Sequence, residues 1–440
     1  LSLHDALPIS SSNSYPEQFL KSFPYSKANA NFEEADWAQI QLNILDSAVP
    51  YPIATLSQSA LEHNLAWMAQ YAKQKQVLLA PHGKTTMSPQ LFTKQLSAGA
   101  WGLTFATLFQ AKIGIEAGAR NIIIANQIVS FADLDALLAL KNQYADLSIY
   151  FLIDSLAQLD IIDTWHQQLA QPCAALDVLI EIGITNKRTG CRTTKQAQQL
   201  AQAIASSQAV QLKGLECYEG NAGICNSQHD SQAVSDLILR VQEVAYFCDQ
   251  EQLFASSSIL ISAGGSAIFD LIIPLLKTKG LQVEVQGVLR SGCYITHDHI
   301  HYRQYLKLVE ERENLTSSLQ PALLVWAMVQ SVPEAGLALL SCGKRDISYD
   351  LDLPQPVLTA AFHAKSLANA TNTPQHWRVT ALNDQHAYLH FDASDTTTTP
   401  QVGDKVALGI SHPCTTFDKW RWMPIVDDKG VILSTIRTWF

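Results

Sequence analysis

Short apolar runs alternate with longer amphipathic segments along most of this chain, and this rhythm limits the folds open to it. Segments such as 108–117 and 194–205 place apolar residues three and four positions apart, which predicts helices. The strand-like runs are 77–80, 102–106, 121–125, 148–153, 177–182, 212–218, 258–262 and 283–289. Eight strand–helix units within about 250 residues predict a closed parallel (β/α)8 barrel.

A doubly wound open sheet is the competing architecture, because alternation alone does not reveal whether a sheet closes. The strand count favours closure. The chain also lacks a GxGxxG turn after an early strand and a GxxxxGK[ST] loop, which are the usual signatures of nucleotide-binding sheets.

The pattern changes after about residue 305, where turn-rich β segments predict a mostly β second domain. We therefore expect a barrel domain at 51–305 and a β domain at 306–440, to which residues 20–50 could belong. Residues 1–10 resemble the translation of a sequencing adapter and are excluded as a suspected artefact. The expected strands of the second domain are 321–332, 336–341, 377–382, 387–391 and 405–410.

Charge and hydropathy favour a small-molecule site. Thirty Lys and Arg against 40 Asp and Glu give a net charge of −10, which repels nucleic acid and anionic lipid. No apolar run approaches the ~18 residues of a membrane span, and the chain start has no secretory signal pattern. The predicted location is therefore the cytoplasm. Most of the eight cysteines are expected to be reduced thiols.

A lysine follows the first predicted strand, in the segment PHGKTT of residues 81–86. Active sites of such barrels lie where the strands end, and a barrel wall that desolvates Lys84 would lower its pKa. The neutral amine could then attack a carbonyl carbon, with His82 beside it. The alternative is an ordinary exposed loop lysine.

Other strand ends carry groups that suit a phosphorylated aldehyde. The glycine turns at 262–266 and 290–294 could bind phosphate through backbone amides, although such turns are also common without a ligand. The Arg188 cation could lie at a phenolic oxygen of such an aldehyde, and Tyr218 could lie near its ring. Alternatively, Arg188 pairs with a surface acid and Tyr218 fills the barrel top.

An H-x-C pair, His412 and Cys414, lies in the second domain. Imidazole and thiolate two residues apart can bind one divalent cation such as Zn²⁺, but two ligands alone do not make a site. Three histidines after the last barrel strand, His297, His299 and His301, could also bind metal, although solvated loop histidines are the favoured interpretation.

These motifs together resemble the D-serine dehydratase-like, or D-threonine aldolase-like, branch of the alanine racemase fold, from about residue 51 to the C-terminus. The resemblance implies a pyridoxal-phosphate barrel with a mostly β C-terminal domain, a homodimer, and Lys84 as the Schiff-base lysine. It implies that His412 and Cys414 bind zinc or another divalent metal. The implied cofactor-binding residues are Lys84, His82, Arg188, Tyr218, Gly264, Gly265, Ser266, Gly292, Cys293 and Tyr294.

The function implied is metal-assisted α,β-elimination from a D-β-hydroxy-amino acid such as D-serine, giving a 2-oxo acid and ammonia. Related aldolases have an acidic residue in place of Cys414, which favours elimination here. Many dehydratases of the family have a histidine in place of Thr86, so the substrate stays open. The alternatives are D-threonine aldol cleavage or racemisation on the same cofactor, and a non-enzymatic cofactor-binding protein.

Overall fold

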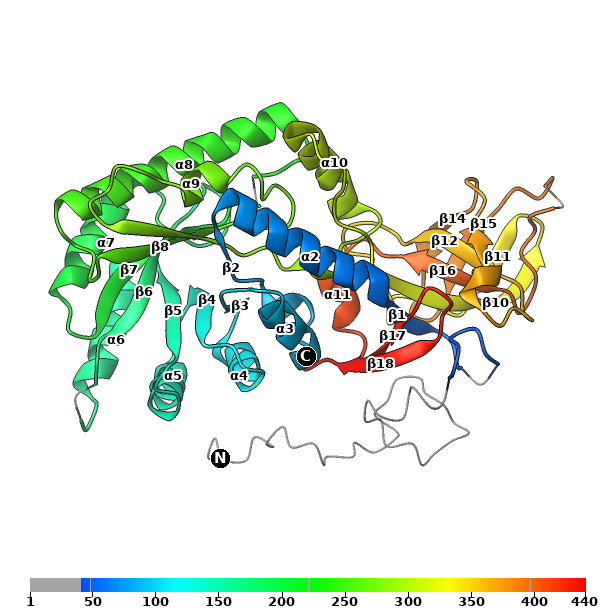
Figure 1. The fold of residues 1–440 in the computed structure, drawn as a ribbon, viewed down its shortest axis with the longest axis horizontal. Helices are drawn as coiled ribbons and strands as arrows, with labels where there is room; N and C mark the ends of the chain where they lie inside the picture. The colour runs from blue at the N-terminus through cyan, green and yellow to red at the C-terminus, as the bar shows by residue number, and fades with distance from the viewer. Residues whose placement is uncertain (1–40, 48, 172, 221, 396) are drawn as a thin grey trace.

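Two sheets organise the computed structural model, which describes residues 41–47, 49–171, 173–220, 222–395 and 397–440. The suspected artefact at 1–10 and residues 20–40 lie outside the described part. The barrel and the C-terminal sheet occupy opposite ends of the long axis, and helix α2 runs from one towards the other (Figure 1).

The eight-stranded sheet is parallel and has the order β2-β9-β8-β7-β6-β5-β4-β3. Its end strands approach each other through a single parallel bridge between His82 and Thr104, so the barrel is nearly closed. All eight predicted strands are present, which confirms the expected fold class. They are β2 (Leu78–Leu79), β3 (Leu103–Phe105), β4 (Asn121–Gln127), β5 (Ser148–Ile153), β6 (Leu176–Ile182), β7 (Val210–Cys217), β8 (Ser258–Ala263) and β9 (Glu284–Leu289).

Both faces of these strands are buried, and alternate residues serve different cores. In β4, Ile122 and Ile124 face the surrounding helices, whereas Ile123 joins the cluster inside the barrel. Leu179 of β6 occupies the same inner cluster. Burial on both faces explains why the strands appear in the sequence as continuous apolar runs.

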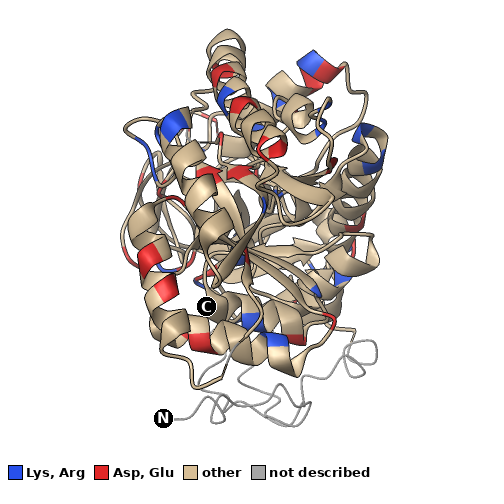
Figure 2. Cartoon of the chain, turned by 90° about the vertical axis from the view of Figure 1, so that its left-hand side faces the viewer, with Lys and Arg blue, Asp and Glu red and all other residues tan. Residues whose placement is uncertain are grey.

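Helices surround the barrel, and side-chain caps define several of their starts. Thr193 and Gln196 form a reciprocal capping box at the start of α7, and Ser155 accepts the Gln158 amide at the start of α6. The helices are α2 (Gln58–Lys75), α3 (Pro89–Ser97), α4 (Leu108–Glu116), α5 (Phe131–Gln143), α6 (Leu156–Gln167), α7 (Thr194–Ser206), α8 (Ser227–Gln250), α9 (Ile273–Leu276) and α10 (His301–Glu313), with one-turn 3-10 helices η3 (Gly83–Thr85) and η4 (Cys293–Ile295). Acidic and basic positions are mixed over the outer helices (Figure 2).

The second sheet forms the C-terminal domain and includes one strand from before the barrel. β1 (Ile53–Ser57) pairs with β10 and β17 of this sheet, so the domain boundary expected at residue 51 lies after β1. The other elements are β10 (Leu323–Glu334), β11 (Leu337–Leu340), β12 (Gln355–Ala360), β13 (Thr371–Asn372), β14 (Arg378–Leu382), β15 (Ala387–His390), β16 (Lys405–Gly409), β17 (Trp422–Val426) and β18 (Ile432–Arg437), with η5 (Leu367–Asn369) and α11 (Cys414–Phe417). Ile44 and Leu45 pack into the core of this sheet beside Trp326.

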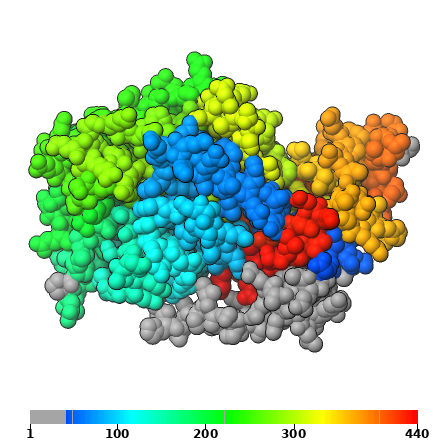
Figure 3. Space-filling model, viewed as in Figure 1, coloured from blue at the N-terminus to red at the C-terminus, as the bar shows by residue number. Residues whose placement is uncertain are grey.

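The end of the chain attaches the β domain to the loop that carries Lys84. The Trp439 amide donates to the carbonyl of Met87 at 2.9 Å, and the Arg437 amide donates to the Gln90 side chain at 3.3 Å. In the space-filling view the C-terminal segment lies beside the N-terminal end of α2 (Figure 3). None of the described helices is long and apolar enough to cross a membrane.

Candidate active site

Lys84 lies in η3, a single helical turn that begins four residues after the end of β2, at the carboxyl end of the barrel. Gly83 permits this turn, since a Cβ there would lie 2.3 Å from the ring of Phe105. The turn is half-buried at Lys84 and buried on both sides of it. A side chain held in this way has little room to reach bulk water.

Burial is the main cause that lowers the pKa of the Lys84 amine. The guanidinium groups of Arg188 and Arg290 lower it further, while the sulfurs of Cys414 and Cys293 act in the opposite direction. A desolvated amine near two cations is more often neutral at physiological pH, as a nucleophile for a carbonyl carbon must be.

Arg188 and Tyr218 meet on the same side of this mouth. The Arg188 guanidinium lies over the Tyr218 ring, 4.5 Å from its centre. A Cβ at Gly265 would lie 3.0 Å from the Tyr218 ring, so the glycine turn packs against the tyrosine. Burial raises the pKa of Tyr218 to about 12, which keeps its hydroxyl protonated.

The two predicted phosphate turns also meet at the mouth. The Cys293 amide donates to Ser266 Oγ at 3.1 Å, and a Cβ at Gly292 would lie 2.5 Å from the His82 carbonyl oxygen. The amides of Gly264 and Gly265, however, donate to the buried carboxylate of Glu219, at 3.0 and 2.5 Å. These amides were predicted to bind phosphate, but in the structure they donate to side-chain oxygens of the protein itself.

Sequence reasoning missed a buried ion pair beneath these turns. Arg290, directly after β9, forms a salt bridge with Glu216 at the end of β7, and both side chains are at most 5% exposed. Arg290 Nε and Glu216 Oε2 have no protein partner, and neither has His82 Nδ1. Charged residues at the ends of apolar strands were the available signal for this pair.

His412 is held by a carboxylate that the sequence did not single out. Its Nδ1 lies 2.6 Å from Asp350 Oδ2, and the Thr415 hydroxyl donates to Asp350 Oδ1 at 2.6 Å. This contact fixes the imidazole and leaves its Nε2 for another partner. Asp350 comes from the loop after β11, and no sequence signal connects it to His412.

The β domain contributes Cys414 to the same place as Lys84. Its thiol donates to Thr85 Oγ1 at 3.5 Å and lies 3.7 Å from the sulfur of Cys293. The hydrogen bond with Cys293 lowers the pKa of Cys414 and raises that of Cys293. Barrel and β domain therefore share one site, although the described residues include no group of three or more His, Cys, Asp or Glu that could hold a metal ion.

Tyr294 does not join this site. Its ring is buried in the hydrophobic core, where its hydroxyl faces Gln95 of α3. The neighbouring histidines also differ from the solvated loop expected: His297 is 2% exposed, and burial lowers the pKa of His297 and His299 to about 4. His301 instead contacts the rings of Tyr302 and Tyr305 in α10.

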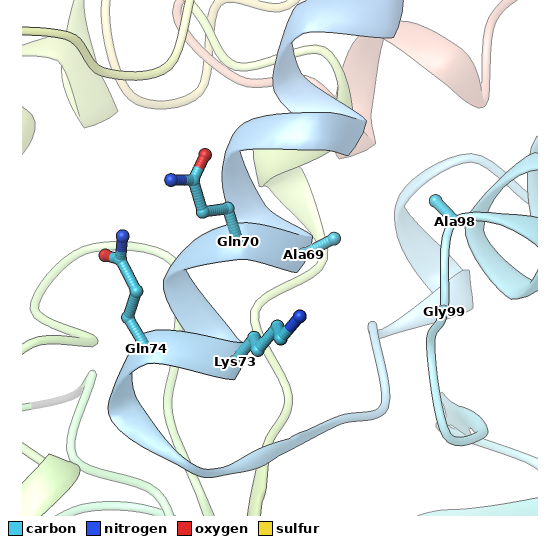
Figure 4. Close-up of a pocket in the computed structure, with 6 residues that line it drawn as sticks. All are labelled: Ala69, Gln70, Lys73, Gln74, Ala98 and Gly99. Carbon is cyan, nitrogen blue, oxygen red and sulfur yellow. The ribbon is translucent and has the colours of Figure 1, made fainter.

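A surface depression lies away from the site around Lys84. An open depression of about 760 Å³ separates α2 from the turn after α3, with Lys73 extending into it (Figure 4). Its other lining residues are small or uncharged: Ala69, Gln70, Gln74, Ala98 and Gly99. It holds none of the predicted site residues.

A parallel barrel with a lysine at its mouth and a β domain over that mouth defines an alanine racemase-like protein. Family models place an "Alanine racemase, N-terminal domain" at residues 56–274 and a "Putative serine dehydratase domain" at residues 322–426. The chain therefore belongs to the alanine racemase-fold family of pyridoxal-phosphate enzymes that includes D-threonine aldolase and D-threo-3-hydroxyaspartate dehydratase.

Individual relatives agree with this assignment. A D-threonine aldolase from an Arthrobacter species is 26% identical over 87% of this chain and 90% of its own. The D-threo-3-hydroxyaspartate dehydratase of Delftia sp. HT23 is 32% identical over 32% of this chain and 35% of its own. The solved D-threonine aldolase from Filomicrobium marinum shares the fold, with a TM-score of 0.70, 22% identity and coverage of 89% and 95% of the two chains.

Breaking the buried ion pair should destabilise the barrel. Arg290→Leu leaves the Glu216 carboxylate buried without its partner, so we expect a loss of about 3–5 kcal/mol in unfolding free energy. Urea denaturation of the wild type and the variant measures this difference in unfolding free energy. The double variant with Glu216→Leu should recover part of the loss; equal losses in the single and double variants would show that the charge pairing contributes little.

Removing Arg188 should change the pH at which the Lys84 amine becomes neutral. Because Arg188 lowers the pKa of Lys84, Arg188→Met raises that pKa and shifts the midpoint of cofactor attachment to higher pH. The rate of attachment of added pyridoxal phosphate, followed by absorbance across a pH series, reports the midpoint. Lys187→Met, which removes an exposed neighbouring cation, should leave the midpoint in place.

Proposed function

We propose that this protein is a pyridoxal-phosphate-dependent lyase that eliminates the β-hydroxyl group of a D-β-hydroxy-amino acid and releases a 2-oxo acid and ammonia. The observation that carries the proposal is the contact of Cys414, from the β domain, with Thr85, the residue next to Lys84 in the barrel. D-Serine and D-threo-3-hydroxyaspartate are the substrates we favour.

The residues at the barrel mouth fit the cofactor. Three buried polar atoms there lack a protein partner: His82 Nδ1, Arg290 Nε and Glu216 Oε2. A Cβ at Gly292 would collide with the His82 carbonyl oxygen. The glycine therefore lets the backbone of its turn lie close to the loop that carries Lys84. The Glu219 carboxylate already uses the Gly264 and Gly265 amides, and the Cys293 amide donates to Ser266 Oγ, so the Ser266 O–H and the backbone of Gly292 remain for the phosphate.

Bound pyridoxal phosphate draws electrons away from the α-carbon of an amino acid. Lys84 would hold the aldehyde through its Nζ, and the same atom would take the α-proton of the substrate. Burial and the nearby guanidinium groups favour the neutral amine that both roles need. Arg188, stacked on Tyr218, would provide positive charge beside the ring of the cofactor.

His412 and Cys414 fit a divalent cation by their donor chemistry. The contact of Asp350 with His412 Nδ1 is the carboxylate–histidine arrangement that supports many metal-binding imidazoles. A divalent cation is a Lewis acid for an oxygen ligand, and hydroxide is a poor leaving group without one. With two protein ligands, positions stay open for substrate and water.

Aldol cleavage is the second candidate, supported by the relatives named D-threonine aldolase and 3-hydroxy-D-aspartate aldolase. The thiol at Cys414 and the match to a putative serine dehydratase domain favour elimination. A cofactor-binding protein without activity would have no use for the His412–Asp350 pair beside the site.

The reaction and its lysine can be tested together. The wild-type protein, given pyridoxal phosphate and zinc, should release pyruvate and ammonia from D-serine in equal amounts, whereas glycine and acetaldehyde from D-threonine would identify an aldolase. Lys84→Ala should lose turnover and the cofactor's visible absorbance. Lys73→Ala, at an exposed lysine of α2, should keep both; turnover without Lys84 would contradict the proposal.

Asp350 should strengthen metal binding through His412. Asp350→Ala removes the acceptor for His412 Nδ1 and should weaken zinc binding about 10- to 100-fold. Competition with a chromophoric chelator measures the affinity without any turnover. Asp352→Ala, two residues away, should bind zinc like the wild type, and unchanged affinity in Asp350→Ala would remove Asp350 from this role.

A further inference from the structure

Two cysteines from different domains face each other beside Lys84. The sulfur of Cys293, at the start of η4 in the barrel, lies 3.7 Å from the sulfur of Cys414, at the start of α11 in the β domain. Both thiols are free, and both contact Thr85 Oγ1, at 3.8 and 3.5 Å. The two positions are 121 residues apart in the sequence.

The surroundings favour a bond between these two sulfurs. A disulfide has a sulfur–sulfur length of about 2.05 Å, so the sulfurs need to approach by roughly 1.7 Å. Cys293 is 4% exposed, which shields it from reagents in solution, whereas Cys414 is partly exposed. An oxidant therefore reaches Cys414 first and finds the second thiol already in contact with it.

We propose that Cys293 and Cys414 are an oxidative modification site, at which a hydroperoxide converts the two thiols into a disulfide that switches the enzyme off. The Cys414 sulfur attacks one peroxide oxygen and the O–O bond breaks, giving a sulfenic acid and, with hydrogen peroxide, one water. The Cys293 sulfur then attacks the Cys414 sulfur, the S–O bond breaks, and a second water leaves. Two thiols and one hydrogen peroxide thus yield one disulfide and two waters.

The functional consequence rests on the proposed function, in which Cys414 binds the divalent cation. A disulfide removes the Cys414 thiolate from the cation and ties α11 to η4 across the mouth that holds Lys84. The formation of the bond itself depends only on the contact between the sulfurs.

A shared metal ion is the competing explanation for the sulfur pair. Two thiolates on one tetrahedral zinc would also lie about 3.8 Å apart, given Zn–S bonds of ~2.3 Å. With His412 and Cys414 as the ligands of the cation, Cys293 would be a third ligand, and within the described ranges no group of three or more His, Cys, Asp or Glu is placed to hold a metal ion. The geometry therefore favours the disulfide.

Peptide mapping tests the proposal directly on the full-length protein. Reduced protein is treated with hydrogen peroxide, with and without zinc, then alkylated under denaturing conditions, digested and analysed by mass spectrometry. We expect a linked pair of peptides containing Cys293 and Cys414, activity that falls in proportion to the linked fraction, and recovery of both with dithiothreitol. Bound zinc should slow the linkage.

Variants separate the roles of the two thiols. Cys293→Ser should prevent the linkage and make peroxide inactivation resistant to dithiothreitol, while Cys173→Ser, at a partly exposed cysteine elsewhere, should behave as the wild type. Absence of the linked peptide in the wild type would overturn the proposal. So would an equal loss of zinc affinity in Cys293→Ser and Cys414→Ser, which would identify a metal site. Linkage in a protein without lyase activity would instead reject the proposed function and leave the modification site standing.

Discussion

The burial of one lysine amine is the constraint on which the site depends. Lys84 is placed by a single turn between a barrel strand and a helix, where solvation of an ammonium group is poor. Two guanidinium groups on the same side add to the cost of its charge. The lowered pKa favours the neutral amine, at a position set by the turn between a barrel strand and a helix.

Two buried carboxylates, Glu216 and Glu219, hold the groups around Lys84 in place. Glu219 fixes the glycine turn at 264–265 through two backbone amides, and Glu216 fixes Arg290. Each of these carboxylates is buried, so its interactions are made in a medium less polar than water and are costly to break. This rigidity suits a site that must orient a cofactor, and it also explains why the sequence-based phosphate assignment for Gly264 and Gly265 was incomplete.

The barrel could be predicted because its strands are buried on both faces and its helices on one, which leaves periodic signals in the sequence. The C-terminal sheet was predicted less completely: β12, β13, β17 and β18 were missed, and β1 joins a sheet whose other strands lie more than 260 residues later. Strand pairing over such distances depends on contacts that local periodicity does not record. Lys84, Arg188, Tyr218 and the glycine turns were predicted as site residues because strand ends are where barrel sites occur.

By itself, the sequence determined the eight strand–helix units, the β-rich second half, and the lysine and H-x-C motifs. Each of these features depends only on residues that are close together in the chain. Only the tertiary structure decided which side chains meet. In the folded chain Tyr294 lies in the core, and the Gly264 and Gly265 amides donate to Glu219. Asp350 contacts His412, and the Cys414 sulfur lies next to Cys293 beside Lys84. The physical reason is that these contacts join residues from separate strand ends and separate domains, whose proximity arises from packing and not from spacing along the chain.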